Sequence, residues 1–410
     1  MALGTHWMHR FARWIVVDKI GITGWGIVSG VQAMGRGDWP AGLESRKSVA
    51  FCSPSDPAAR YHLLMENKAE KPEGILRGLR VLDGGMASEL EFRGARIDGP
   101  LWSAHVLEDA PDRVVAVHRA YLEAGAEILL TASYQVSRMG YRECGLDRTR
   151  ADGALLKAVK LARMASAEFA ERRVVVAASL GPYGAALHNG AEYHGNYAVG
   201  FAELVEFHRE RIEVLAQAGQ DAPDLLGFET LPSLEEAQAI GEALACWPDL
   251  AAWFCFTCKD EQHVAHGERL ADCAAEVAQF PQTVAIGVNC TGPALIPALI
   301  GELRKAEDKP VIVYPNSGEG WDEEARCWNG TGDPASFGHS SQQWFAAGAQ
   351  IVGGCCRTRP DHIRLVAEAA RTANGHSSEG ARCPSGPSGT GGGLKFVRRA
   401  TFRKDAQGKG

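Results

Sequence analysis

The sequence predicts an α/β fold, a single (β/α)8 barrel of the TIM type, on three observations. Eight apolar runs of strand length recur along the chain, helix-patterned segments separate them, and several of these segments end in glycine just before the next run. Eight such units in a chain of this size match the strand count and length of a barrel. The runs span residues 79–86, 126–134, 174–181, 224–231, 250–258, 284–291, 310–317 and 349–356.

Residues 1–77 precede the repeating pattern, and we expect them to form a poorly ordered N-terminal extension and linker. Residues 53–74 are rich in Pro, Ser and charged side chains, which is typical of a linker. Arg10, Arg13 and Lys19 stand among few acids. A mitochondrial transit peptide therefore stays open as an alternative for this segment.

The eight runs are rich in Val, Ile, Leu, Ala and Gly and do not alternate with polar residues. Strands that are buried on both faces have this composition. The alternative is a doubly wound open sheet. It would not usually need eight strands, and no GxGxxG follows the first run. The barrel is therefore the better prediction for residues 78–373.

Helical periodicity separates the runs. Gly125, Gly219 and Gly348 follow helical segments, as glycines at helix C-termini do. After the last run, Thr358 is expected to cap a helix whose first turn contains Pro360. The clearest helical segments before it are residues 112–124, 201–218, 233–245 and 268–279.

Residues 374–410 follow the last helical pattern and differ from it in composition. They are rich in Gly, Ser and Pro and become basic toward the end of the chain. Such a segment buries too little apolar surface to fold alone. We expect a disordered basic tail.

Composition narrows the function classes. The 410 residues are 45% hydrophobic and 23% charged, with a net charge of −7. Without a dense basic patch, nucleic acid is not an expected partner. No uncharged apolar run reaches about 18 residues, so a membrane span is not expected. The eleven cysteines do not form a closely spaced framework, which favours free thiols or metal ligands in a reducing compartment. We expect a cytoplasmic protein, a monomer or weak oligomer.

Polar residues gather at the C-terminal ends of the runs. In a barrel these ends share one mouth, where the chemistry of the fold is found. A carboxylate there carries a desolvation cost unless it has a partner. The residues are Asp83, Thr131, Ser133, Ser179, Glu229, Asn289, Cys290, Tyr314, Asn316, Cys355 and Cys356.

Cys290, Cys355 and Cys356 are candidate metal ligands at this mouth. The runs that carry them are the sixth and the eighth, so their ends can face one ion across the seventh. Adjacent cysteines on an extended strand point in opposite directions, but Gly353 and Gly354 allow the backbone to turn. Each cysteine taken alone is more often a buried apolar thiol. Together they predict a zinc site with three thiolates and a fourth position open.

Cys255 and Cys258 form the competing thiol motif. They lie inside a predicted strand, where an offset of three places the sulfurs on opposite faces. A redox pair of the thioredoxin type needs a helix start instead. We interpret these two as core cysteines.

Zinc held by three thiolates is a poor activator of water, but it can hold a substrate thiol as a reactive thiolate. The sequence therefore favours alkylation of a thiol by an activated methyl group. In a sulfonium donor the reaction removes charge, which a dry site assists. Asp83 and Glu229 suit the ammonium group of an amino-acid thiol. Tyr183, Asn316 and Trp321 are candidates for the donor site, the aromatic rings as cation partners.

At this point the chain resembles the homocysteine S-methyltransferase family, in the branch that uses S-methylmethionine or S-adenosylmethionine. The resemblance runs over residues 79–369, and Trp321 stands where the family more often has a tyrosine. The motifs that carry it are DGGMASEL from Asp83, LWSA from Leu101, TASYQ from Thr131, GPYGA from Gly181, EYHGNY from Glu192, FET from Phe228, GVNC from Gly287, YPNSGE from Tyr314 and GGCCRT from Gly353.

The resemblance implies a zinc-bearing barrel with Cys290, Cys355 and Cys356 as ligands and methionine as product. It also implies that Asp83 and Glu229 contact homocysteine, and that Asn289 and the segment from Thr131 to Ser133 line the pocket. No cobalamin module is expected. S-Methylmethionine is favoured as donor, because no adenosine-binding glycine-rich loop is recognisable.

Three alternatives stay open on the sequence. The acceptor is another small thiol or a selenol such as selenocysteine, the barrel binds thiols or metal without catalysis, or Cys255 and Cys258 support a thiol oxidoreductase. Each makes a different prediction for methyl transfer to homocysteine.

Overall fold

In the computed structural model, the described residues are 12–18, 21–28, 74–78, 80–97, 101–305, 308–322, 327–330 and 332–379. Within 1–77, these include the antiparallel pair of β1 (Ala12–Asp18) and β2 (Gly21–Val28). The expectations for most of that extension, and for residues 380–410, concern residues outside these ranges. The last helix continues past residue 373, the boundary expected from the sequence, to Glu379.

Seven parallel strands form the central sheet in the described part of the chain, in the order β11-β8-β7-β6-β5-β4-β3. Each lies within or next to a run predicted from the sequence, so the α/β barrel class is confirmed. The strands are β3 (Ile128–Leu130), β4 (Val175–Leu180), β5 (Leu225–Leu231), β6 (Ala252–Phe256), β7 (Thr283–Asn289), β8 (Val311–Tyr314) and β11 (Ile351–Val352).

The eighth position of the barrel is very short. Val81 bridges Val352 of β11, and Leu82 bridges Ile128 of β3, so these two residues join the two edges of the sheet. The carboxylate of Glu127 accepts hydrogen bonds from the amides of Arg80 and Val81, at 2.7 and 3.0 Å. These two amides are therefore not paired with a neighbouring strand. The first predicted strand, residues 79–86, is therefore reduced to two bridging residues, Val81 and Leu82, which close the ring of strands.

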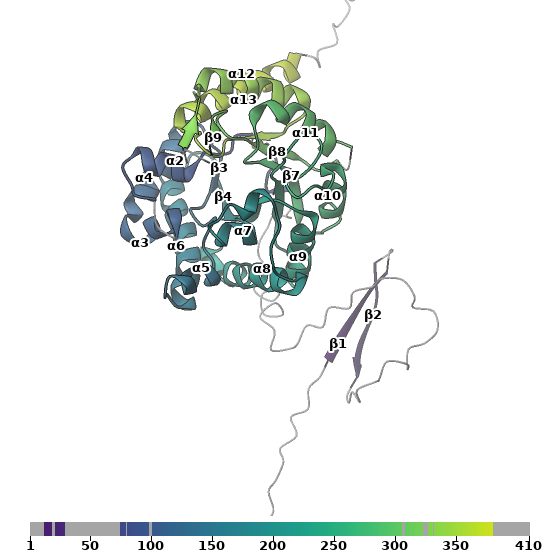
Figure 1. Ribbon diagram of the computed structural model, residues 1–410. Coiled ribbons are helices and arrows are strands. Elements are labelled where there is room, and N and C mark those ends of the chain that lie inside the picture. The colour runs from purple at the N-terminus through teal and green to yellow at the C-terminus, as the bar shows by residue number, and fades with distance from the viewer. Residues whose placement is uncertain are drawn as a thin grey trace, which may run out of the picture.

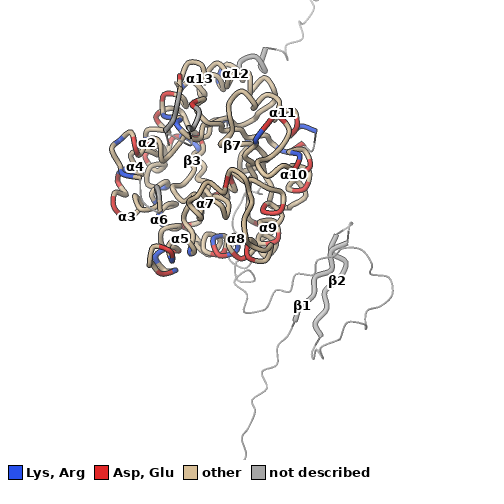
Figure 2. The backbone as a smooth tube through the Cα atoms, viewed as in Figure 1, with Lys and Arg blue, Asp and Glu red and all other residues tan. Residues whose placement is uncertain are grey.

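Helices surround the strands on the outside (Figure 1). Charged residues of both signs lie mainly on these helices, whereas the strands are almost free of charge (Figure 2). The helices are α2 (Met86–Phe92), α3 (Val106–Asp109), α4 (Pro111–Glu123), α5 (Arg138–Glu143), α6 (Arg148–Ala167), α7 (Tyr183–Ala186), α8 (Phe201–Ala216), α9 (Leu234–Leu244), α10 (Leu270–Val277), α11 (Ile296–Leu303), α12 (Pro334–Ala347) and α13 (Pro360–Glu379).

Shorter elements complete the mouth loops. A two-stranded antiparallel ribbon pairs β9 (Gly320–Asp322) with β10 (Cys327–Asn329). Four 3-10 turns occur among the described residues: η2 (Trp102–His105), η3 (Ala191–Tyr193), η4 (Gly219–Asp221) and η5 (Pro293–Leu295). Over the same residues, no helix combines the length and the apolar character that crossing a membrane requires.

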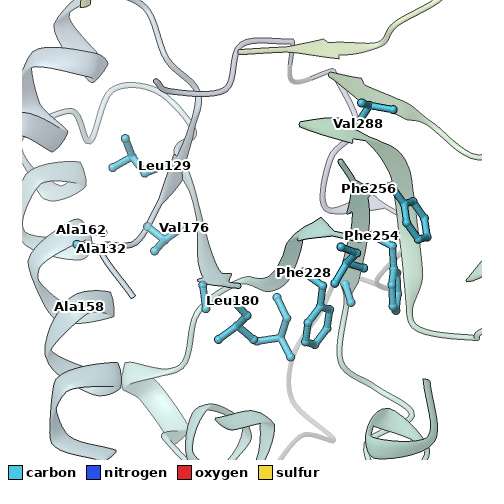
Figure 3. Close-up of a cluster of buried hydrophobic side chains, with 14 of the residues drawn as sticks. Leu129, Ala132, Ala158, Ala162, Val176, Leu180, Phe228, Phe254, Phe256 and Val288 are labelled. Atoms are coloured by element: carbon cyan, nitrogen blue, oxygen red, sulfur yellow. The ribbon is translucent and has the colours of Figure 1, made fainter. Parts of the chain in front are cut away.

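The hydrophobic core has two parts, one on each face of the sheet. The outer part packs strand residues such as Leu129, Val176 and Phe254 against the helices (Figure 3). The inner part fills the barrel with residues such as Trp253 and Ile312. Both faces of each strand are therefore buried, which explains the unbroken apolar runs in the sequence.

Gly287 of β7 is required by the close approach of β8. A Cβ atom at this position would lie 1.8 Å from the carbonyl oxygen of Ile312, its register partner on that strand. Backbone atoms cannot yield at such a distance without moving the strand. The glycine therefore sets the spacing of two strands just below Asn289 and Cys290.

Candidate metal centre and substrate pocket

Three cysteine side chains meet at the mouth of the barrel. Cys290 follows β7, and Cys355 and Cys356 follow β11. Their sulfur atoms all lie within 4.8 Å of one another, and the Sγ atoms of Cys290 and Cys356 are 3.7 Å apart. Two sulfurs bound tetrahedrally to one zinc ion at 2.3 Å each would be separated by about 3.8 Å. The observed spacing therefore fits three ligands of one zinc ion.

The turn that holds Cys355 is tightly bonded. The Cys355 amide donates to the carbonyl of Pro315 at 2.8 Å, and the Thr358 hydroxyl donates to the carbonyl of Cys355 at 2.6 Å. A Cβ atom on Gly354 would lie 2.4 Å from that hydroxyl. Thr358 thus fixes the cysteine turn and accepts from the Gly85 amide at 3.1 Å, instead of capping α13 as the sequence suggested.

Backbone strain is concentrated around the same site. Thr230, Cys290 and Arg357 have positive φ angles of 58°, 47° and 65°. Non-glycine residues rarely adopt this conformation, and it costs free energy that the surrounding structure must offset. Cys290 is a candidate ligand, Thr230 directly follows Glu229, and Arg357 directly follows Cys356. The strained positions therefore coincide with the predicted chemistry.

A cavity of about 170 Å³ opens beside the cysteines. Thr131, Glu229 and Asn289 line it, together with the three cysteines, so strand ends far apart in the sequence converge on one space. Ser133 is not part of the lining. Its hydroxyl lies 2.6 Å from that of Thr131 and donates to the carbonyl of Ser179, so it supports Thr131 from behind.

Asp83 is not part of the cavity lining, but its chain neighbour Gly84 and its hydrogen-bond partner Leu130 are. Only 1% of the surface of Asp83 is exposed. One carboxylate oxygen, Oδ2, accepts from the Leu130 amide at 2.9 Å, and the other, Oδ1, has no partner among the described residues. Burial raises the pKa of Asp83 well above its usual value, and the charge of Glu229 raises it further. A cation near Oδ1 would relieve this penalty.

Glu229 is a second buried carboxylate, and it lines the cavity. Its Oε1 accepts a hydrogen bond from the Ser179 hydroxyl. Burial raises the pKa of Glu229 to about 7, even though the Ser179 hydroxyl acts in the opposite direction. Asp83 and Glu229 therefore form a buried pair that favours a positively charged ligand.

Asn289 lines the cavity and also stabilises its wall. Its side-chain oxygen accepts from the Thr230 amide at 2.6 Å, and its side-chain nitrogen donates to the Thr230 hydroxyl at 2.9 Å. This pair of hydrogen bonds holds Thr230 in its strained conformation. The amide of Asn289 thus links the end of β5 to the cysteine that follows β7.

Two of the three residues assigned to the donor site from the sequence, Tyr183 and Asn316, are absent from the cavity lining. The ring of Tyr183 packs against Tyr197 and Phe207 in the outer core, and its hydroxyl donates to Glu203 at 3.1 Å. The Asn316 amide donates to the Thr291 carbonyl at 3.1 Å.

Trp321, the third donor-site candidate, belongs to β9 and is paired with Trp328 of β10. Both side chains lie outside the described residues. Its assignment stays a prediction.

Glu192, Tyr193 and Tyr134 also line the cavity. Although 49% of the Tyr193 surface is exposed, the charges of Cys290 and Cys356 raise the pKa of its hydroxyl well above the usual value. Burial raises the pKa of Glu192 to about 7. The EYHGNY motif was the available signal for Glu192 and Tyr193, and the TASYQ motif for Tyr134.

The cysteine sulfurs share protons in the absence of metal. Hydrogen bonds from the Cys290 and Cys355 thiols hold the pKa of Cys356 well below its usual value, and the Tyr193 hydroxyl acts in the same direction. The pKa of Cys355 is raised well above its usual value by its hydrogen bonds to Cys290 and Cys356. These hydrogen bonds favour the thiolate form of Cys356, and a divalent ion would favour the thiolate form of all three cysteines.

Cys255 and Cys258 have the separate environments that the sequence predicted. Cys255 points into the inner core, and Cys258 packs against the outer core. Burial raises the pKa of both thiols. Neither has the exposed, low-pKa environment of a redox-active cysteine.

Comparison with known proteins agrees with this site. The family model for homocysteine S-methyltransferase matches residues 80–370. Homocysteine S-methyltransferase YbgG of Bacillus subtilis is 44% identical over 302 residues, covering 72% of this chain and 95% of that protein. Homocysteine S-methyltransferase of Escherichia coli is 42% identical over 292 residues, covering 70% and 93%.

Solved structures show the same relationship. The metallated form of the homocysteine methyltransferase MmuM from Escherichia coli aligns with a TM-score of 0.64 and 39% identity. The alignment covers 72% of this chain and 99% of that protein. Fold, site and sequence therefore lead to one conclusion: the chain belongs to the homocysteine S-methyltransferase family and is a methyltransferase.

Proposed function

We propose that this protein transfers a methyl group from a sulfonium donor to the thiol of L-homocysteine, giving methionine, and that it requires zinc. S-Methylmethionine is the favoured donor, with S-adenosylmethionine as the alternative. The observation that carries the proposal is the gathering of the Cys290, Cys355 and Cys356 sulfurs within 4.8 Å at the cavity.

Cys290, Cys355 and Cys356 would hold the zinc ion. When bound, zinc would keep the homocysteine sulfur as a thiolate at neutral pH while leaving it nucleophilic. The protein would supply three sulfurs that line the cavity, and the substrate thiol would be the fourth ligand, as in catalytic zinc sites that bind substrate. The solved relative described as metallated supports a metal in this family.

Asp83 and Glu229 would hold the acceptor by its ammonium group. Both are buried, and one oxygen of Asp83 has no partner among the described residues. An ammonium group supplies the missing donors and the missing positive charge.

The methyl transfer itself needs orientation and a dry site. The bond between the donor sulfur and its methyl carbon breaks as the homocysteine sulfur forms a bond to that carbon, and the donor leaves as a neutral thioether. The thiol proton goes to solvent before the transfer. Because a cation and an anion become two neutral groups, the transition state is less charged than the reactants, and a cavity lined by buried side chains favours it.

The Asp83→Asn variant tests the acceptor contact. We expect the KM for homocysteine to rise about 10- to 100-fold, since a charge-assisted hydrogen bond is lost. The KM for the donor and the zinc content should not change. Steady-state kinetics with each substrate varied in turn gives the answer, with Asp361→Asn on the surface of α13 as the matched control. An unchanged homocysteine KM would remove Asp83 from the acceptor site.

The donor is tested by comparing the rates with the two sulfonium substrates. We expect methionine to form from homocysteine and S-methylmethionine faster than from homocysteine and S-adenosylmethionine, because no glycine-rich loop typical of adenosine binding is present in the sequence. Homocysteine consumption is measured with each donor offered separately, because one transfer from S-methylmethionine yields two methionines and one transfer from S-adenosylmethionine yields one. A higher kcat/KM with S-adenosylmethionine would reverse the preference, and no product from either would reject the proposed function.

We further propose a cytoplasmic protein that acts without cobalamin, as a monomer or weak oligomer. A reducing compartment suits the cysteine cluster, since its thiols must stay free to bind metal.

A further inference from the structure

One carboxylate at the cavity has no role in the proposed function so far. Glu192 lies in η3, in the loop that follows β4, and lines the cavity together with Tyr193 and Tyr134. Its Oε2 is buried and has no hydrogen-bond partner among the described residues. A buried, unpaired carboxylate oxygen is costly unless a ligand supplies the partner.

The loop that carries Glu192 is held in place at both ends by one residue. Glu236 of α9 accepts from the Tyr183 amide at 2.5 Å and from the Tyr197 hydroxyl at 2.9 Å. It is itself fully buried and lies 2.9 Å from Nε2 of His208. The segment 183–197 is therefore tied to α8 and α9, and the position of Glu192 is built into the fold.

Packing within the loop fixes Glu192 further. A Cβ atom on Gly184 would lie only 2.4 Å from the backbone nitrogen of Glu192, so the chain folds back on itself here. The Tyr193 amide donates to the carbonyl of Gly190 at 3.0 Å, and the Gly195 amide donates to that of Ala191 at 2.8 Å. The backbone of Glu192 is therefore fixed by the packing of its loop, unlike that of an acid on a flexible surface segment.

Glu192 reaches the cavity from a loop, whereas Glu229 lies in β5 and Asp83 follows the bridges of Val81 and Leu82. The charge of Glu229 acts on Asp83. Glu192 lines the cavity together with Cys356, Tyr134 and Tyr193. It therefore stands beside the metal ligands with aromatic side chains around it, a combination that suits a cation.

The proposed reaction brings two cationic groups close to the cysteines: the ammonium of the acceptor and the sulfonium of the donor. Asp83 and Glu229 account for the first. We propose that Glu192 binds the sulfonium donor, its carboxylate facing the positive charge while the tyrosines cover the apolar groups around it. This inference rests on the proposed function and makes Glu192 a determinant of donor affinity.

The Glu192→Gln variant keeps the shape and removes the charge. We expect the KM for S-methylmethionine to rise about 10- to 100-fold, with the homocysteine KM within about twofold of wild type and the zinc content unchanged. Glu203→Gln is the matched control: Glu203 lies on the first turn of α8, accepts from the Tyr183 hydroxyl and is absent from the cavity lining.

Calorimetric titration tests the same contact without turnover, so it separates this inference from the proposed function. We expect wild type to bind S-methylmethionine at least about tenfold more tightly than the neutral thioether methionine, and Glu192→Gln to lose most of this preference. A preference that survives in Glu192→Gln would overturn the inference. So would a rise in the homocysteine KM alone, because Glu192 would then belong to the acceptor site.

Discussion

Replacement of Cys356 by alanine is expected to abolish both zinc binding and methyl transfer. The two remaining thiols cannot complete the three-sulfur site, so bound zinc should fall from about one per chain to a small fraction. With the acceptor thiol no longer activated, kcat/KM should fall by at least about 1,000-fold. Metal analysis of the purified protein and the rate of methionine formation measure the two effects.

Cys246→Ala provides the matched control, since Cys246 is also partly buried but lies outside the three-cysteine cluster. It should keep its zinc and its rate. Full activity in Cys356→Ala would show that the reaction does not depend on this cluster. Zinc retained at about one per chain would contradict the assignment of Cys356 as a required ligand.

Replacement of Gly287 by alanine is expected to destabilise the barrel more than any other single methyl group added to a described strand. The new Cβ would lie 1.8 Å from the Ile312 carbonyl oxygen, so β7 and β8 must move apart. We expect the free energy of unfolding to fall by about 3 kcal/mol or more, and the thermal midpoint to fall by on the order of 5–10 °C. Thermal denaturation followed by circular dichroism measures this.

The same substitution at Gly153 should act in the opposite direction. Gly153 lies on the exposed side of α6, and nothing lies within 4 Å of a Cβ atom built there. Alanine at such a site stabilises a helix by about 0.5–1 kcal/mol. Equal effects of the two substitutions would mean that the contact between β7 and β8 is not what requires Gly287.

The parts of this fold that the sequence predicts well are those that depend on burial alone. Strands such as β5 and β7 are covered on both faces, and their composition shows it. The three metal-ligand candidates were also predictable, because parallel strand ends must share one mouth. The first strand was not, since its length depends on Glu127, whose carboxylate occupies amides that a longer strand would have paired.

Loop residues were predicted less well because their positions depend on contacts remote in the sequence. Tyr183 was assigned to the donor site from its place after a strand, yet Glu236 draws its amide toward α9 and its ring packs into the core. The same anchoring brings Glu192 to the cavity. Nothing local in either motif indicates which side chain faces the substrate.

The closure of the ring through Val81 and Leu82 has a consequence for how the pocket responds to ligands. The next residue is Asp83, whose carboxylate accepts from the Leu130 amide and which the proposed function assigns to the acceptor. A molecule that binds this carboxylate also stabilises the closed ring against local unfolding. Opening of the ring at Val81 and Leu82 would in turn release the molecule. Affinity for the acceptor and cohesion of the barrel are thus thermodynamically linked, and a change in either alters the other.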